Sequence, residues 1–114
     1  MRYVFAALAL LLTTNTQLAL AGEVANATVV ELAIFREYGN FVFVRTDVTP
    51  TSKPTCATNG AWHFTLSLSA VAGKETYAML LAAKTSGKRV HISGSNQCLE
   101  FGQIESIRGL NILD

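Results

Sequence analysis

The sequence predicts a mainly β domain in which one helix interrupts five short strands, and three observations lead to this prediction. First, residues 62–69 alternate between apolar and polar side chains, a period of two that is typical of a half-buried strand. Second, residues 73–86 have the pattern of a helix, which ends at Gly87 because glycine readily adopts a C-cap conformation. Third, strand patterns occur on both sides of this pair, so the order of elements is β-β-β-α-β-β.

Two strands are expected before the alternating segment. Residues 27–35 are rich in β-branched side chains, and residues 41–46 are apolar on nearly both faces. Between them, Tyr38-Gly39-Asn40 supplies a turn because its glycine can take a positive φ. Two prolines then mark residues 47–60 as the one long irregular stretch.

Two more strands are expected after the helix. Residues 89–93 alternate again, and residues 104–113 form the last strand, with a bulge around Gly109 where the alternation slips. Five short strands that close on themselves have no exposed edge, and this order of elements is that of a five-stranded OB-fold barrel. An open α+β sheet with the helix on one face is the alternative.

The first residues predict an export signal rather than a part of the fold. Arg2 precedes an apolar run at residues 4–12, and Ala19-Leu20-Ala21 has the small residues that signal peptidase recognises. Cleavage after this tripeptide divides the chain into a signal peptide, residues 1–21, and a single OB-fold-like domain, residues 22–114. A membrane-spanning helix needs about 20 apolar residues, so a retained anchor is the less favoured alternative. The expected location is the periplasm or the outside of the cell, without membrane insertion.

Cys56 and Cys98 are expected to form a disulfide, because exported proteins meet an oxidising environment. Closing this loop would stabilise the fold by roughly 4 kcal/mol in the loop-entropy model. Free thiols or a metal pair are the alternatives. The two histidines, His63 and His91, do not complete the ligand spacing of a structural zinc site, so no metal and no cofactor are expected.

The charge balance argues against nucleic acid as a partner. Arg2 is one of nine Lys and Arg residues, and the eight that follow it equal the eight Asp and Glu residues in number. A nucleic-acid-binding domain normally presents a basic stripe to phosphate, which a neutral mature chain lacks. The partner is therefore expected to be neutral or locally polar.

No residues form a recognisable catalytic group, so the chain is expected not to be an enzyme. No serine lies in a nucleophile elbow or a Ser-x-x-Lys setting, and nothing indicates that Glu31 and Glu105 act as a paired acid and base. His63 and His91 are expected to be solvated surface side chains on the polar faces of their strands.

Several runs of residues carry a family resemblance. They are Tyr77 to Ile92, Cys56 with Trp62 six residues later, and Cys98 followed by Ile104-Glu105-Ser106-Ile107. Together they resemble small exported bacterial proteins of the subtilase cytotoxin B-subunit kind, within the AB5 toxins. The resemblance implies an OB-fold subunit that forms a homopentameric ring with its helices lining the pore. It also implies binding of cell-surface glycans, sialylated ones included, and delivery of a separate catalytic A chain.

A candidate glycan site follows from the OB-fold prediction. OB-folds commonly bind oligosaccharides on the face of strands two and three, with the loops after strands one and four. In this chain those loops offer a tyrosine for stacking and amide and guanidinium donors for a neutral or acidic sugar. The predicted ligand-binding residues are Arg36, Tyr38, Asn40, Asn96 and Gln97. Trp62 is a conceivable further platform, although its place in the alternation favours packing in the core or at its rim.

The competing prediction is a monomeric or dimeric periplasmic module that binds another protein or stabilises an assembly, with no glycan activity. The two predictions differ in what happens to the outward face of the helix, expected to carry Met79, Ala83 and Ser86. A ring would bury this face and one sheet edge between subunits, whereas a monomer would leave both in water.

Overall fold

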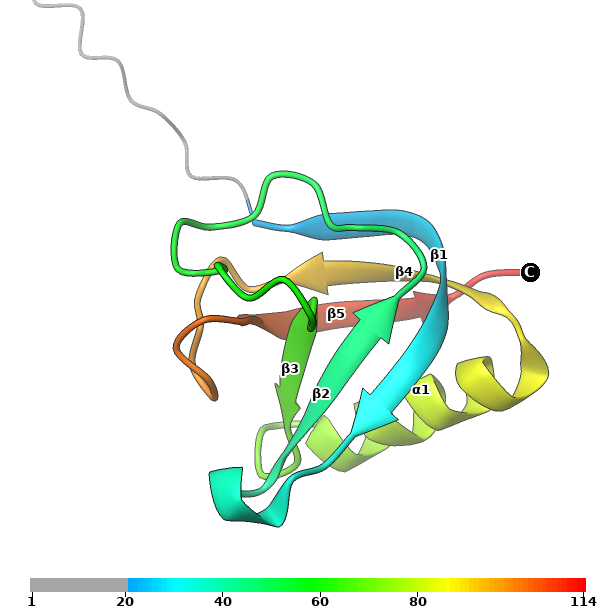
Figure 1. The fold of residues 1–114 in the computed structure, drawn as a ribbon. Coiled ribbons are helices and arrows are strands. Elements are labelled where there is room, and N and C mark those ends of the chain that lie inside the picture. Colours follow the sequence, from blue (N-terminus) through cyan, green and yellow to red (C-terminus); the bar gives the residue numbers. More distant parts are fainter. Residues whose placement is uncertain (1–20) are drawn as a thin grey trace, which may run out of the picture.

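The computed structural model describes residues 21–114, and its elements follow the predicted order (Figure 1). The helix α1 (Gly73–Ser86) lies between the third and fourth strands, and a short 3-10 helix η1 (Arg36–Tyr38) joins the first two. The strands are β1 (Glu23–Ala33), β2 (Phe41–Thr46), β3 (Phe64–Ser67), β4 (Arg89–Gly94) and β5 (Glu105–Ile112). Apart from Ala21, the predicted signal peptide lies outside the described residues.

The five strands pair in the closed order β1-β2-β3-β5-β4. Strand β1 permits this closure because its first half pairs with β4 and its second half pairs with β2, both antiparallel. Strands β3 and β5 pair in parallel, and the remaining pairs are antiparallel. The prediction of a mainly β domain with one helix, in the order β-β-β-α-β-β, is confirmed. Within the described part of the chain, no helix has the length and apolar character needed to cross a membrane.

The strand ends differ from the sequence expectation where local contacts override alternation. Strand β1 starts at Glu23 rather than at residue 27, because a register shift lets both Val24 and Ala27 point inward and be fully buried. Strand β3 starts two residues after Trp62, since the Asn59 side chain folds the preceding segment into a turn. Its Oδ1 accepts hydrogen bonds from the backbone N–H groups of Ala61 and Trp62, at 2.8 and 2.9 Å.

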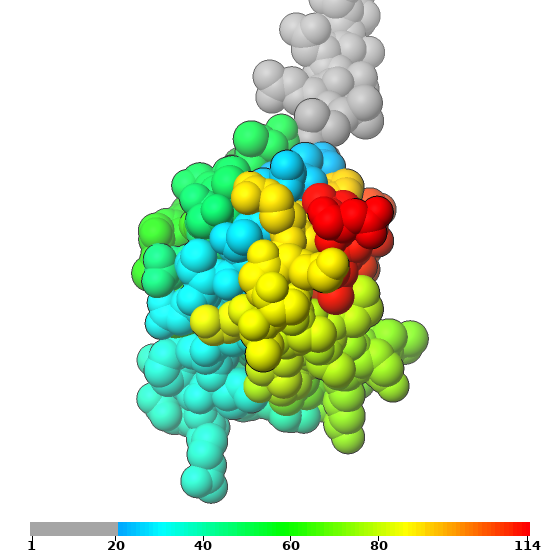
Figure 2. All heavy atoms as spheres, turned by 90° about the vertical axis from the view of Figure 1, so that its right-hand side faces the viewer, coloured from blue at the N-terminus to red at the C-terminus, as the bar shows by residue number. Residues whose placement is uncertain are grey.

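The main core lies between the sheet and α1. Leu80 and Ala83 of α1 are almost completely buried, since residues three apart lie on one face of a helix. They pack against a cluster that includes Phe64, Val90 and Ile92. Ala83 therefore does not belong to the outward face of the helix, where the sequence analysis placed it. Figure 2 looks onto the side that carries α1 (yellow-green to yellow), which lies on the surface beside β1 (blue to cyan) and near the C-terminal segment (red).

The predicted irregularity at Gly109 is present. Ser93 pairs with Gly109, whereas Gly94 pairs with Ile107, so Arg108 is an extra residue in β5. This bulge shifts the register at the end of β4 that faces the start of β5. It sets Gly94 directly over the side chain of Glu105, where a Cβ atom on Gly94 would lie 2.2 Å from the carboxyl carbon.

Candidate functional site

Five aromatic side chains gather at the end of the molecule where β1 leads into β2. Their ring centroids lie 5.3 Å apart for Phe35 and Phe43, 5.5 Å for Phe43 and Trp62, and 5.6 Å for Tyr38 and Phe101. Most pairs meet edge to face, the arrangement that aromatic quadrupoles favour. We call Phe35, Tyr38, Phe43, Trp62 and Phe101 the aromatic cluster.

Four separate segments of the chain supply the aromatic cluster. Phe43 comes from β2 and is 3% exposed, so it forms the base. Phe35 precedes η1 and Tyr38 is its last residue, and the Tyr38 N–H donates to the Phe35 carbonyl oxygen at 3.0 Å. Gly39 then turns the chain into β2 with φ of 115°, a value that side chains with a Cβ rarely adopt. Trp62 precedes β3, and Phe101 comes from the loop between β4 and β5.

The aromatic cluster lines a pocket of about 280 Å³, together with Glu37 and Asn59. Small-molecule sites measure roughly 300–1,000 Å³, so this pocket suits a ligand about the size of one sugar ring. Its rim is wet, because Tyr38 is 53% exposed and Phe35 38%. The pocket thus combines apolar ring faces with one carboxylate and one carboxamide at its edge, a lining suited to binding a ligand that is apolar on one face and polar at its edges.

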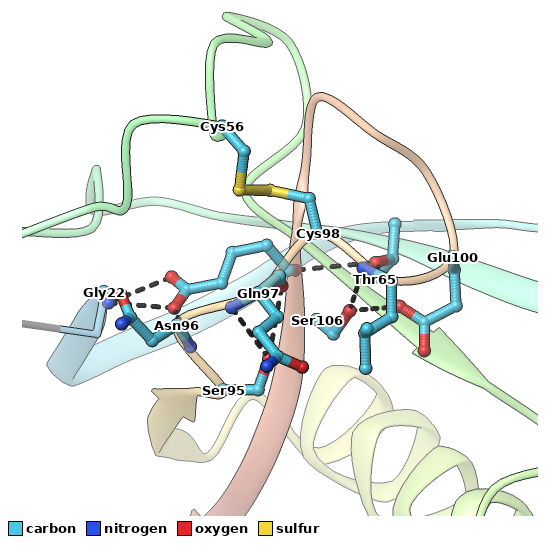
Figure 3. Close-up of a disulfide and its surroundings, with 11 residues drawn as sticks. Gly22, Cys56, Thr65, Ser95, Asn96, Gln97, Cys98, Glu100 and Ser106 are labelled. Carbon is cyan, nitrogen blue, oxygen red and sulfur yellow. Dashed lines mark hydrogen bonds between the residues drawn. A yellow bond between two sulfur atoms is a disulfide. The ribbon is translucent and has the colours of Figure 1, made fainter. Parts of the chain in front are cut away.

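The disulfide between Cys56 and Cys98 joins the two long loops that carry part of this lining (Figure 3). Cys56 lies three residues before Asn59, and Cys98 lies three residues before Phe101. The Asn59 N–H also donates to the Gln103 carbonyl oxygen at 3.0 Å, which ties the same loops together a second time. The predicted disulfide is confirmed.

Of the five predicted ligand-binding residues, only Tyr38 lines the pocket. Arg36 is exposed in η1 but is not part of the lining. Asn40 is exposed as well, and its Nδ2 donates to Ser69 Oγ at 3.0 Å. These two residues lie close to the pocket in the sequence without contributing to its wall.

Asn96 and Gln97 lie at the other end of β1, beside Gly22 and the disulfide (Figure 3). The Asn96 N–H donates to Glu105 Oε2 at 2.8 Å, and the Gln97 carbonyl oxygen accepts from the Ser106 N–H at 2.8 Å. Both residues hold the loop between β4 and β5 in place. The structure therefore separates these two amides from Tyr38, which follows the far end of β1.

Phe35, Phe43, Asn59 and Phe101 were not among the binding residues predicted from the sequence. Phe35, Asn59 and Phe101 flank or lie in loops of the predicted barrel, whereas Phe43 lies inside β2 and its position gave no such indication. Glu37 lies in the loop after the first strand, which was predicted to contribute to the site, but it was not among the predicted ligand-binding residues. The sequence did not predict the pocket, because the four segments that line it meet only after the sheet closes.

The two histidines have different surroundings, and neither belongs to the pocket. His63 is half-buried, and its Nδ1 accepts a hydrogen bond from the Thr46 N–H at 3.2 Å. Burial, followed by the nearby charges of Lys53 and Arg45, lowers the pKa of His63 below its usual value. The expectation of a solvated surface side chain therefore holds only in part for His63. His91 Nε2 lies 2.5 Å from Glu23 Oε1 at the surface.

Among residues 21–114, no group of three or more His, Cys, Asp and Glu side chains is arranged to hold a metal ion. No protein-family model, no curated protein and no solved structure matches the chain. The resemblance to AB5 toxin B subunits therefore stays a prediction from the sequence.

Proposed function

We propose that this chain is an exported, non-enzymatic OB-fold protein that binds a glycan in the aromatic pocket. The observation that carries the proposal is where the pocket lies relative to the strands. OB-fold proteins bind oligosaccharides and oligonucleotides on the face of strands two and three, with the loops after strands one and four. The pocket has Phe43 from β2, Trp62 just before β3, Tyr38 from the loop after β1, and Phe101 from the loop after β4.

The lining favours a neutral sugar as the ligand. Aromatic rings present flat apolar faces on which the C–H face of a sugar ring can lie, and hydroxyl groups then meet polar groups at the rim. Glu37 accepts hydrogen bonds from hydroxyl groups. Asn59 uses its Oδ1 for the backbone of the next turn, which leaves its Nδ2 to donate. The carboxylate of Glu37 is the only charged group in the lining, and it would repel phosphate or a sugar acid.

Trp62 provides a direct readout, because it is the only tryptophan of the chain and lines the pocket. We expect neutral mono- and disaccharides, titrated into the purified protein, to change its fluorescence in a saturable way. Glycan-array binding then ranks the larger sugars.

The Tyr38→Ala variant is expected to lose the glycan signal and to keep its circular dichroism spectrum, because Tyr38 is half exposed and lies outside the core. Arg36→Ala is the matched control: it changes the same short helix without touching the lining, and we expect it to bind as the wild type does. Retained binding by Tyr38→Ala, or equal loss in both variants, contradicts this placement.

For the assembly, we propose a ring of five copies that presents five such pockets and carries a separate catalytic chain. Met79 and Leu81 flank the buried Leu80 on opposite sides of α1, and both are large, apolar and about 40% exposed, which supports contacts between α1 and neighbouring subunits. Native mass spectrometry of the mature protein tests the ring. A five-fold mass supports it, whereas a single-chain or two-chain mass removes it and favours a small periplasmic module that binds another protein through the same helix.

A further inference from the structure

A carboxylate is buried beside Gly22, at the opposite end of β1 from Phe35 and Tyr38 of the pocket. Glu105 opens β5, is 1% exposed and ranks among the largest fully buried side chains. Its oxygens accept hydrogen bonds from the Gly22 nitrogen, at 3.0 and 3.1 Å, and from the Asn96 N–H at 2.8 Å. Within the described part of the chain, the ion pairs are Arg45 with Glu31 and His91 with Glu23, so Glu105 has no cationic side chain as a partner.

The chain is shaped around this carboxylate. A Cβ atom on Gly22 would lie 2.2 Å from Glu105 Oε1, and a Cβ on Gly94 would lie 2.2 Å from both Glu105 Cδ and Oε2. Two glycines from different segments therefore leave the space that the carboxylate fills. Since a buried ionised carboxylate is costly unless it is paired and hydrogen-bonded, a site built this closely calls for a positive charge.

The nearest nitrogen to this carboxylate is that of Gly22, the residue after the predicted cleavage site. It lies almost equally far from both carboxylate oxygens, which a peptide nitrogen can contact only by sharing its single hydrogen between them. An ammonium group has three hydrogens. Asn96 offers a further acceptor in the same group of residues, because its Oδ1 is buried and has no hydrogen-bond partner in the described part of the chain.

We propose that removal of the leader between Ala21 and Gly22 creates an α-ammonium group that forms a buried ion pair with Glu105. The nitrogen that the carboxylate holds is the same one that the predicted cleavage would release. In the cleavage, water adds to the Ala21 carbonyl carbon and the Ala21–Gly22 C–N bond breaks. Ala21 leaves as a carboxylate, and Gly22 keeps the nitrogen and takes up protons to become the ammonium. This inference rests on the proposed export of the chain and is independent of glycan binding.

Backbone hydrogen bonds of Gly22 and Glu23 hold the new N-terminus in place. The Gly22 carbonyl oxygen accepts from the Gly94 N–H at 2.8 Å, and Glu23 exchanges two backbone hydrogen bonds with Thr51, at 3.0 and 3.1 Å. One residue of extended chain spans about 3.5 Å. In a chain that starts at Ala21, the ammonium group therefore lies out of reach of Glu105, although every other contact of Gly22 stays the same.

The first experiment is the intact mass of the full chain after export with its own leader. The expected species runs from Gly22 to Asp114 with one disulfide. A different N-terminus overturns the proposal, because the charge would then lie elsewhere.

The second experiment is a double-mutant cycle on the mature domain, whose described residues form one closed sheet with its own core. Chains that start at Gly22 or at Ala21, each with Glu105 or with Glu105→Gln, are released from a cleavable fusion and unfolded in urea. With Glu105 present, we expect the unfolding equilibrium constant to be at least tenfold lower for the Gly22 start, equivalent to about 1.4 kcal/mol. In the Glu105→Gln background, the two starts should differ less than twofold.

Acetylation of the Gly22 amine covers the case in which Glu105→Gln does not fold. It keeps the sequence and one N–H but removes the charge, so it should raise the unfolding equilibrium constant by the same tenfold factor. Equal stability of the acetylated and free chains, or of the Gly22 and Ala21 starts, overturns the proposal. Sugar titration of the Ala21 start separates this proposal from the proposed function, because the pocket is at the other end of β1 and its affinity should be unchanged.

Discussion

Replacing Gly94 with alanine tests how closely the protein is packed around Glu105. The new Cβ atom would lie 2.2 Å from Glu105 Cδ and Oε2 and 2.4 Å from Oε1. Non-bonded atoms do not approach a Cβ within 3.0 Å, so the carboxylate has to move by about 1 Å or more. It cannot do so and keep its hydrogen bonds to the Gly22 nitrogen and the Asn96 N–H, which measure 2.8 to 3.1 Å.

The expected loss follows from those contacts. A hydrogen bond to a charged group contributes about 1.5–3 kcal/mol, and forcing an extra methyl group into a packed core costs about 1–3 kcal/mol. We therefore expect Gly94→Ala to lower the free energy of unfolding by about 3 kcal/mol. Urea denaturation followed by Trp62 fluorescence and by far-UV circular dichroism measures this change. With a urea dependence of about 1–3 kcal/mol per molar, the midpoint should fall by about 1–3 M.

Gly60→Ala is the matched control. Its Cβ would meet no atom within 4 Å, and Gly60 does not have the positive φ found at Gly39 and Gly87. We expect this variant to stay within about 1 kcal/mol of the wild type. In a Glu105→Ala background the clash is gone, so the further cost of Gly94→Ala should fall below about 1 kcal/mol. A loss of less than about 1 kcal/mol for Gly94→Ala alone, or the same loss in both backgrounds, refutes the reasoning.

Two more predictions concern pH and the disulfide. Because burial lowers the pKa of folded His63, the unfolded chain takes up a proton first as the pH falls below about 6.5, and the fold loses stability there. His63→Asn keeps an acceptor for the Thr46 N–H but cannot titrate, so its free energy of unfolding should change less between pH 7 and pH 5; an unchanged pH dependence contradicts this role. Replacing both Cys56 and Cys98 by alanine opens a loop with a sequence separation of 42, which should cost about 4 kcal/mol in urea unfolding; a cost below about 1 kcal/mol argues against the loop-entropy estimate.

The sequence predicted the order of elements because local signals mark most of their limits. Gly87 ends α1, with φ of 68°, and the helix runs from Gly73 to Ser86 as expected. The run at residues 41–46 forms β2 as predicted, since its apolar side chains are buried on both faces. Strand alternation gave the wrong strand start where a bulge or a side-chain-capped turn intervenes, as at Val24 and Asn59. The bulge depends on pairing with β4, which lies far away in the sequence, whereas the Asn59 cap spans two and three residues and is not visible in the alternation.

The candidate site was less predictable than the fold. Tyr38 could be placed because it flanks a turn in the loop after the first strand, where OB-folds bind ligands. Glu37 and Phe101 lie in the loops after the first and fourth strands but were not predicted as ligand-binding residues, and Asn96 and Gln97 hold in place a loop that was predicted to bind a ligand. The sequence did not predict the burial of Glu105 either. A charged residue at the start of a strand normally faces water, and only the closed sheet brings Gly22 and Gly94 around it.

The disulfide has a second consequence besides stability, because it joins loops that contact both Glu105 and the pocket. On one side, Cys98 follows directly on the loop residues that surround Glu105; on the other, Cys56 and Cys98 each lie three residues from a wall of the pocket. The hydrogen bond from Asn59 to Gln103 is a weaker tie between the same loops. A chain without the disulfide should therefore hold Phe101 and Asn59 less firmly even where it stays folded. Its affinity for a sugar should then fall in native buffer, whereas a disulfide that only stabilises the fold would leave the affinity of folded molecules unchanged.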